Sequence, residues 1–317
     1  MAEKIKFVLL FFLGLCLGRA ELFAAGQSAL AFLKIVPGAR ASALGETYAG
    51  LAQGPEAPAF NAAGLAGEGR KQVSLQHSFF VEGILYDNIV YVHPHTTGVW
   101  AAQVGFLNVK GLKRTVANAS SPDGFSELEN VSTNNLLAAV FYSRRLPKRL
   151  SVGLGAKFLR ESLHDQNSSA AAFDLGIMYK DLNLPLDVGI ALQHLGAHDL
   201  PHTLRAGLAL RRGKKFLPAW LHENSLFALD VSRSLEGHDP AASAGIEIPL
   251  QDGRIAARAG YRYPLNRQHL GHQLSVPNGL AMGFGVKFSG WNADYSATSF
   301  GDLGLTHRLS LTLGIGS

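Results

Sequence analysis

The chain has 317 residues, of which 47% are hydrophobic and 17% are charged, and its mean hydropathy is +0.10. That hydropathy is too low for a bundle of transmembrane helices, and the charged fraction is below the quarter that is usual for soluble domains. The net charge is +5, but the basic residues are mostly scattered singly, so nucleic-acid binding is not expected.

The first twenty residues are typical of a secretory signal peptide. Lys4 and Lys6 precede the apolar run "FVLLFFLGLCLG", and small residues follow it up to Ala20. The run is too short to span a bilayer, so we expect residues 1–20 to be removed, with a cleavage as late as residue 25 as the alternative. The single cysteine, Cys16, leaves with this peptide. The exported protein then has no disulfide, no zinc–thiolate site and no cysteine nucleophile.

Residues 21–70 form a separate N-terminal segment, in which residues 26–70 do not alternate and are rich in alanine and glycine, with prolines at positions 37, 55 and 58. The remaining residues, 71–317, are expected to form a wide β-barrel with room inside. A compact segment of this kind is then expected to fold in the lumen of the barrel as a plug or hatch. An extension outside the barrel is the alternative.

From residue 71 to 317 the chain alternates between apolar and polar or small residues. In "LPLDVGIALQHLG", residues 184–196, four aliphatic residues fall on one face, whereas Asp187 and Gln193 fall on the other. The same test finds fourteen segments, near 72–81, 84–93, 97–108, 135–145, 149–163, 171–182, 184–196, 202–212, 222–234, 240–250, 253–264, 279–288, 291–298 and 307–316. An even number of strands about ten residues long predicts an all-β fold, a closed antiparallel transmembrane β-barrel of fourteen strands.

The predicted connections alternate in length. Long loops are expected at 109–134 and 264–277, after strands three and eleven, and short turns after most even-numbered strands. This is the usual arrangement of long external loops and short periplasmic turns. The basic stretch "RRGKKFLPAWL", residues 211–221, breaks it.

The charged residues within the strands are expected to face the lumen, because a charge facing lipid at mid-membrane costs about 2–4 kcal/mol. They either form a lattice of salt bridges that braces the wall or line a substrate path. The predicted lumen-facing charges are Lys157, Asp174, Asp187, Arg205, Asp230, Glu247, Arg258, Arg262, Lys287, Asp294 and Arg308.

No motif predicts catalysis, a cofactor or a metal. His194, His198 and His202 lie four apart, but Pro201 breaks any helix that could bring them to one face. No spacing of serine, histidine and aspartate residues supports a catalytic nucleophile with its general base. We therefore expect a protein that is not an enzyme, with no catalytic, cofactor-binding or metal-binding residues.

The stretch "GARASALGETYAGLAQGPEAPAFNAAGLA" resembles the N-terminal signature of the PorV/PorQ family, within the wider FadL-like group of long-chain fatty-acid transporters. The resemblance implies an outer-membrane barrel of fourteen strands with an N-terminal hatch, and weaker similarities extend over nearly the whole mature chain. The residues that carry the motif are Gly38, Arg40, Gly45, Tyr48, Asn61, Gly64 and Leu65, with Ala39, Leu44 and Ala63 beside them.

Three positions depart from that family pattern. Ala62 replaces a proline after Asn61, which puts a rigid turn there in doubt. Glu46 stands where a second glycine is usual, so a positive φ there would be strained. The sequence ends in Ser317 without the terminal aromatic residue typical of outer-membrane barrels.

Two functions follow from the resemblance. PorV-like members act in type IX secretion, which implies protein export or surface attachment, with a secreted cargo protein engaged by the loop 109–134. FadL-like members admit hydrophobic small molecules, which implies an uptake channel gated by movement of residues 26–70. Outer-membrane lipid is an expected partner in both cases. A structural barrel with a permanently blocked lumen is a third reading.

Overall fold

The computed structural model describes residues 30–317, except 119, 122, 164–165, 182–184, 197–199, 212–223, 236–239, 266–277 and 317. The predicted signal peptide and residues 21–29 lie outside this part of the chain. No helix in the described residues is long and apolar enough to cross a membrane.

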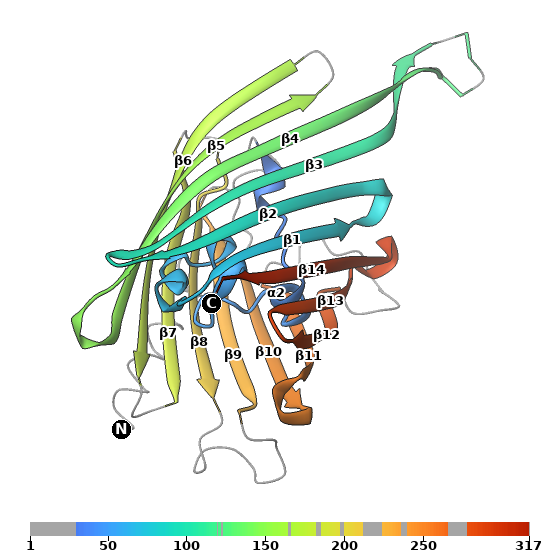
Figure 1. Ribbon diagram of the computed structural model, residues 1–317. Helices are drawn as coiled ribbons and strands as arrows, with labels where there is room; N and C mark the ends of the chain where they lie inside the picture. The colour runs from blue at the N-terminus through green and yellow to red at the C-terminus, as the bar shows by residue number, and fades with distance from the viewer. Residues whose placement is uncertain are drawn as a thin grey trace.

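Fourteen antiparallel strands form one closed barrel, in which each strand pairs with its neighbours in sequence and β1 pairs with β14 (Figure 1). The predicted fold class is therefore confirmed. The strands are β1 (Lys71–Phe79), β2 (Ile84–His95), β3 (Gly98–Ala117), β4 (Phe125–Arg145), β5 (Leu150–Leu163), β6 (Gln166–Asp181), β7 (Leu186–Gly196), β8 (Thr203–Arg211), β9 (Leu226–Ser234), β10 (Ala241–Leu250), β11 (Ile255–Pro264), β12 (Leu280–Phe288), β13 (Trp291–Ser299) and β14 (Leu305–Ile315).

The aliphatic rows lie on the outside of the barrel. On β6, Phe173 is 56% exposed and Ile177 is 51% exposed, whereas Asp174 between them is 3% exposed. On β7, Asp187 and Gln193 are buried inside while Ile190 is exposed. Since successive side chains of a strand point to opposite faces, the alternation in sequence produces an apolar exterior and a polar interior. Such an exterior fits lipid, and closure leaves no sheet edge unpaired within it.

One predicted loop is wrong. Residues 109–134, expected as a long polar loop, are mostly strand, because β3 and β4 stay paired as far as Ala117 and Phe125 (Figure 1). The connection covers only 118–124 and includes Gly124 at a φ of 75°. Threonine and valine favour strands even where the composition is polar, so polarity alone misplaced this boundary. The two other predicted loops, 264–277 and 211–221, fall largely outside the described residues.

The two ends of the barrel can be told apart. The arm end carries the β3–β4 hairpin, and the opposite end, called the short-turn end here, carries the turns 96–97, 146–149, 251–254 and 289–290. Short 3₁₀ turns occur at both ends, at Val81–Gly83, Pro147–Arg149, Gln251–Gly253 and Gly301–Leu303.

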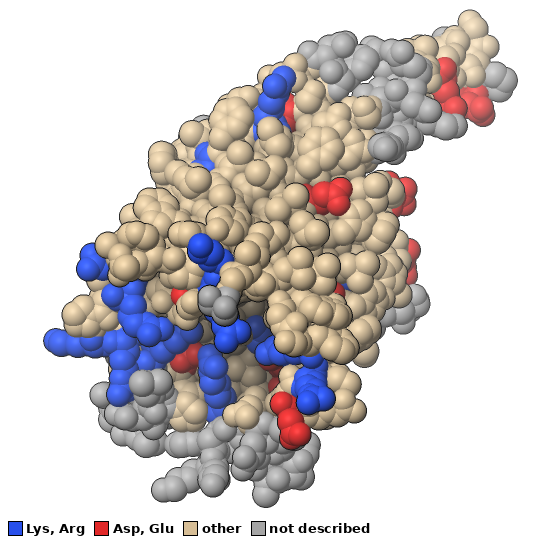
Figure 2. All heavy atoms as spheres, viewed as in Figure 1, with Lys and Arg blue, Asp and Glu red and all other residues tan. Residues whose placement is uncertain are grey.

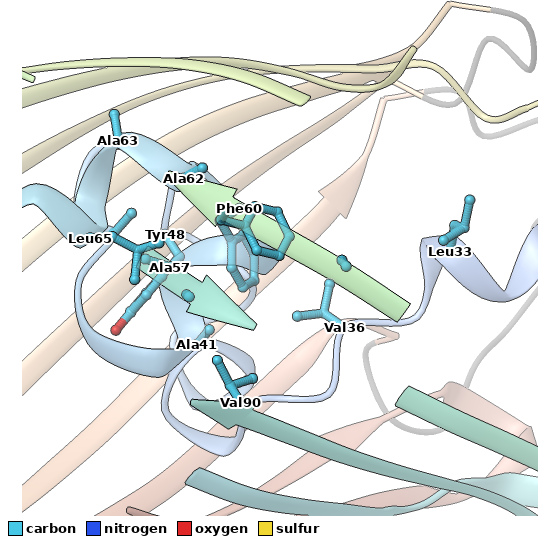
Figure 3. Packing of buried hydrophobic residues seen from close by; sticks show 14 of the residues in the cluster. Leu33, Val36, Ala41, Tyr48, Ala57, Phe60, Ala62, Ala63, Leu65 and Val90 are labelled. Atoms are coloured by element: carbon cyan, nitrogen blue, oxygen red, sulfur yellow. The ribbon is translucent and has the colours of Figure 1, made fainter. Parts of the chain in front are cut away.

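The N-terminal segment, Leu30–Arg70, packs against the inner wall of the barrel (Figure 1). It contains η1 (Ala31–Lys34), α2 (Ala39–Ala43), η2 (Gly54–Ala59) and η3 (Ala62–Gly67). Its apolar side chains, among them Val36, Phe60 and Leu65, form the main buried cluster together with inward residues of the wall such as Val90 (Figure 3). The core of the protein is thus the contact between this segment and the barrel.

Candidate functional site

The inner wall carries a row of glycines, the glycine belt, where the N-terminal segment touches it. Facing pairs on adjacent strands are joined in register: Gly153 with Gly176, Gly189 with Gly207, and Gly245 with Gly260. A Cβ at Gly245 would stand 2.7 Å from the carbonyl oxygen of Leu44, which is closer than real Cβ contacts. Segment and wall therefore pack backbone against backbone.

Asn61 links the segment to the belt. Its Oδ1 accepts a hydrogen bond from the backbone N–H of Ala63 at 3.1 Å, which caps η3. Its Nδ2 donates to the carbonyl oxygens of Ala49 at 3.2 Å and Ile177 at 3.1 Å. The turn after Asn61 thus forms with Ala62 in place of a proline.

The other motif residues hold the segment's own fold. Tyr48 is buried and packs on Phe60 with ring centroids 5.2 Å apart. Gly45 has a φ of 66° and Glu46 a φ of 62°, so the non-glycine residue adopts the left-handed conformation in which strain was expected. Gly64 leaves no room for a side chain against Ala52, and Leu65 is fully buried.

An ionic layer fastens α2 to the wall. Arg40 donates from Nε to Glu247 Oε2 and from Nη2 to Glu247 Oε1, each at 2.8 Å. Arg258 donates to Glu247 Oε2 at 2.6 Å and to Asp294 Oδ1 at 2.7 Å. Two arginines and two carboxylates from the segment and three strands are thereby joined, and the Arg40–Glu247 pair is a two-point contact.

Glu56 supports the same helix from within the segment. Its carboxylate accepts hydrogen bonds from the backbone N–H groups of Arg40 at 3.1 Å and Ala41 at 2.8 Å. Burial raises the pKa of the Glu56 carboxyl above its usual range, and the two backbone hydrogen bonds oppose this rise. Gly38 is required here, since a side chain at that position would overlap the Glu56 carboxyl.

Other inward charges also contact the segment. Asp230 accepts from the backbone N–H groups of Tyr48 at 2.7 Å and Ala49 at 2.6 Å. Arg308, one of the most buried side chains, donates to the carbonyl oxygen of Val36 at 3.1 Å. Two further wall arginines reach the segment: Arg262 lies 3.4 Å from Glu46, and Arg205 stacks 5.1 Å above the ring of Phe60.

The remaining predicted charges pair within the wall or face water. Asp187 pairs with Arg211 at 2.8 Å, while Lys287 is exposed near the short-turn end. Lys157 and Asp174 form a buried pair at 2.7 Å. The predicted charges therefore separate into those that hold the segment, those that brace the wall, and the exposed Lys287.

His194 joins the Lys157–Asp174 pair through a β-bulge that the strand pattern did not predict. The pairing of β6 and β7 shifts between Phe173 and Leu175, and His194 has a φ of 62°. Its backbone N–H donates to Asp174 at 2.9 Å, and its Nδ1 lies 3.1 Å from Lys157 Nζ. Within the described residues no group of three or more His, Cys, Asp or Glu side chains could hold a metal ion.

Two cavities lie at opposite ends of the lumen, with the ionic layer between them. The first has a volume of about 1140 Å³ and is lined by Arg40, Glu247, Arg258 and Asp294, together with residues of the short-turn end such as Arg254. The second, of about 350 Å³, lies toward the arm end and is lined by residues such as Leu33, Arg205, Arg262 and Phe300. The segment α2 and its ionic layer therefore separate the two cavities.

Part of the lumen is apolar, which the sequence reasoning missed. Leu107, Leu137 and Leu159 point inward from β3, β4 and β5 and are buried. They belong to one cluster with Phe32 and Leu33 of η1. The strand alternation already indicated these inward positions. Leu107 lies on the same face of its strand as Gln103, and Leu159 lies on the same face as Lys157. These three leucines are called the apolar sector here.

Comparison with known proteins gives a fold but no family. No family model matches the sequence, and no curated protein matches it. Among solved structures, the TodX monoaromatic hydrocarbon channel deltaS2 mutant is similar with a TM-score of 0.61 and 13% identity, covering 88% of this chain and 99% of that one. The Pseudomonas putida toluene transporter TodX gives 0.54 and 12%, covering 83% and 95%.

A FadL homologue from Pseudomonas aeruginosa is also similar, with a TM-score of 0.56 and 11% identity, covering 92% of this chain and all of that one. None of these comparisons supports the PorV/PorQ resemblance. At such low identity the likeness concerns the fold alone. The chain has the fold of FadL-like fourteen-stranded barrels.

Proposed function

We propose that the protein is an outer-membrane channel for hydrophobic small molecules, with the N-terminal segment as its hatch. The observation that carries this proposal is the apolar sector of the lumen, where Leu107, Leu137 and Leu159 are buried in the same cluster as Phe32 and Leu33 of η1. Binding sites for small apolar ligands are concave and mostly apolar. Two structural neighbours, a monoaromatic hydrocarbon channel and a toluene transporter, support the same class of ligand.

In this proposal the part of the hatch that moves is Leu30–Ala43. The following residues, from Leu44 to Ala63, sit backbone to backbone on the glycine belt and stay in place. Withdrawal of η1 would uncover the apolar sector, and withdrawal of α2 would join the two cavities. A hydrophobic molecule would then bind in the apolar sector and leave through the polar cavity at the short-turn end.

The outer-membrane location belongs to this proposal. The exposed aliphatic rows fit lipid, the N-terminal sequence fits a cleaved signal peptide, and the closed barrel leaves no edge in the bilayer. With residues 71–317 as the barrel wall, the short-turn end would face the periplasm and the β3–β4 hairpin the exterior.

Uptake of radiolabelled toluene and palmitate by cells that carry or lack the gene tests the proposal. We expect uptake of at least one probe to fall on deletion, and Leu137→Gln to lower it about tenfold, because the substitution places an unpaired amide in the apolar sector. The matched control is Val140→Gln on the outer face of the same strand. Uptake unchanged by deletion would contradict the proposal and favour a permanently blocked barrel.

The export role expected from the PorV/PorQ resemblance has no support from the comparisons. The same deletion strain separates the two functions, because a channel for small molecules predicts that secreted and surface-attached proteins stay at their normal levels. Loss of one such protein, with uptake intact, would favour export instead.

A further inference from the structure

Charged side chains of four strands, β4, β6, β7 and β8, lie at the short-turn end. Ser143 points inward and Arg144 outward, so Arg145 at the end of β4 points inward again. Lys180 lies opposite Asp187 in the register of β6 and β7, and Asp187 pairs with Arg211 of β8. Figure 2 shows lysine and arginine side chains gathered at this end of the molecule.

Arg145 and Lys180 converge on one point of the N-terminal segment. A Cβ built on Gly67, the last residue of η3, would stand 3.7 Å from Arg145 Nη2 and 3.9 Å from Lys180 Nζ. Both cations therefore meet above a residue that has no side chain to fill the space between them. The point lies at the mouth of the lumen, where Gly67 is exposed.

The nearby carboxylates are already engaged. Asp187 is held by Arg211 at 2.8 Å. Glu68, next to Gly67, accepts from the backbone N–H of Gly54 at 2.8 Å and from Gln72 Nε2 at 2.6 Å. The described residues thus place three cations and two carboxylates here, Asp187 and Glu68, which leaves an excess of one positive charge. The two positive charges repel each other, and an anion placed between them would attract both and offset that repulsion.

We propose that Arg145, Lys180 and the open space above Gly67 form a binding site for a phosphoryl group. The guanidinium presents a planar fork and the ammonium a compact charge, and this combination suits an oxyanion. Arg211 adds a third positive charge, and exposed Arg144 and Lys148 extend the positive surface to the outer rim. The phosphoryl group belongs to either inorganic phosphate or the headgroup of an anionic phospholipid.

This proposal does not rest on hydrophobic transport, because the site lies beyond the apolar sector and uses no residue of the ionic layer. A bound anion would contact the wall through Arg145 and Lys180 and the segment through Gly67. It would therefore tie the end of η3 to β4 and β6, just after the residues that stay in place in the proposed gating.

The test uses the full chain purified in a neutral detergent. In one arm, the midpoint of thermal unfolding is measured with inorganic phosphate against chloride at constant ionic strength. In the other, the protein is reconstituted in phosphatidylcholine with or without phosphatidylglycerol, and lipid retention is measured by native mass spectrometry. The test variant is the double substitution R145Q/K180Q, and the matched control is Lys287→Gln, an exposed cation elsewhere at the same end.

We expect phosphate, phosphatidylglycerol or both to bind the wild type and the control, and binding to weaken at least tenfold in the double variant. A response to phosphate alone assigns the site to a free anion, and a response to the lipid alone assigns it to a headgroup. Equal responses of the double variant and the wild type, or no response of the wild type to either probe, would overturn the proposal. Stronger binding of a polyglutamate peptide than of both phosphoryl probes would also overturn it, in favour of an acidic protein partner.

Discussion

The contact between Arg40 and Glu247 gives the sharpest prediction about how the N-terminal segment is held. The substitution Glu247→Gln keeps the shape of the side chain but removes its charge. The two arginines that share this carboxylate, Arg40 and Arg258, then face each other with Asp294 as their remaining partner in the layer. We expect α2 to detach from the wall more often.

The magnitude follows from the geometry. Both of Arg40's contacts with Glu247 measure 2.8 Å, and the side chains are only 18% and 17% exposed. A hydrogen bond to a charged group contributes about 1.5–3 kcal/mol, and breaking a fully buried ion pair costs about 3–5 kcal/mol. Since this pair is partly hydrated, we expect a loss of about 2–3 kcal/mol. That energy corresponds to roughly a 30- to 150-fold larger detached population.

Hydrogen–deuterium exchange with mass spectrometry measures this population directly. Peptides that contain Ala39–Ala43 should exchange about 30- to 150-fold faster in the variant, while peptides of β5 and β6 keep their protection. Glu82 lies exposed in the turn between β1 and β2. The control Glu82→Gln should therefore leave the exchange rate of every peptide unchanged. Unchanged protection of α2 in Glu247→Gln would refute the idea that this carboxylate fastens the segment.

Three further outcomes are expected. Gly260→Val should lower the thermal unfolding midpoint, read from heat-dependent gel mobility, because the backbone of Leu44 occupies the space of the new side chain, whereas Gly69→Val has open space and should not. Leu154→Arg should reduce folding stability in lipid vesicles by about 2–4 kcal/mol more than Leu154→Ala, since Leu154 is on the outer face. Burial raises the pKa of Glu56 above its ordinary value of 4.5, so its stabilising contribution is full below pH 4.5 and is lost as the pH rises. Exchange protection of α2 should therefore fall as the pH rises above 4.5, more in the wild type than in Glu56→Gln, and an equal fall in both would contradict this sign.

The barrel could be predicted from the sequence because its physics is local. A strand with one face in lipid and the other in the lumen must alternate, and this alternation is visible in every segment, as in Asp187 and Gln193 between aliphatic neighbours. The limits of β3 and β4 were missed, because polar side chains beyond the membrane no longer show which segments are paired.

The contacts across the lumen could not be predicted in the same way. Arg40 and Glu247 are separated by more than two hundred positions, and their pairing depends on barrel closure and on the register of β10. The apolar sector around Leu159 was also missed, since it breaks the rule that apolar side chains face outward and polar ones inward. The bulge at His194 was missed because it interrupts the alternation itself. The glycine pattern was visible, but its reason, the close approach of another backbone, appears only in three dimensions.

The central claim is that α2 gates the lumen. A reversible disulfide tether between α2 and the barrel wall tests this claim most directly. The hydroxyl oxygens of Ser42 and Thr298 lie 2.9 Å apart, which brings the two side chains within reach of a disulfide if both are changed to cysteine. The only native cysteine is Cys16 of the predicted signal peptide, so the pair is the sole thiol pair in the exported chain. With toluene and palmitate as probes, we predict that uptake stops when the tether is oxidised and returns when it is reduced. Full uptake through the oxidised tether would show that α2 does not gate the lumen and would contradict the account.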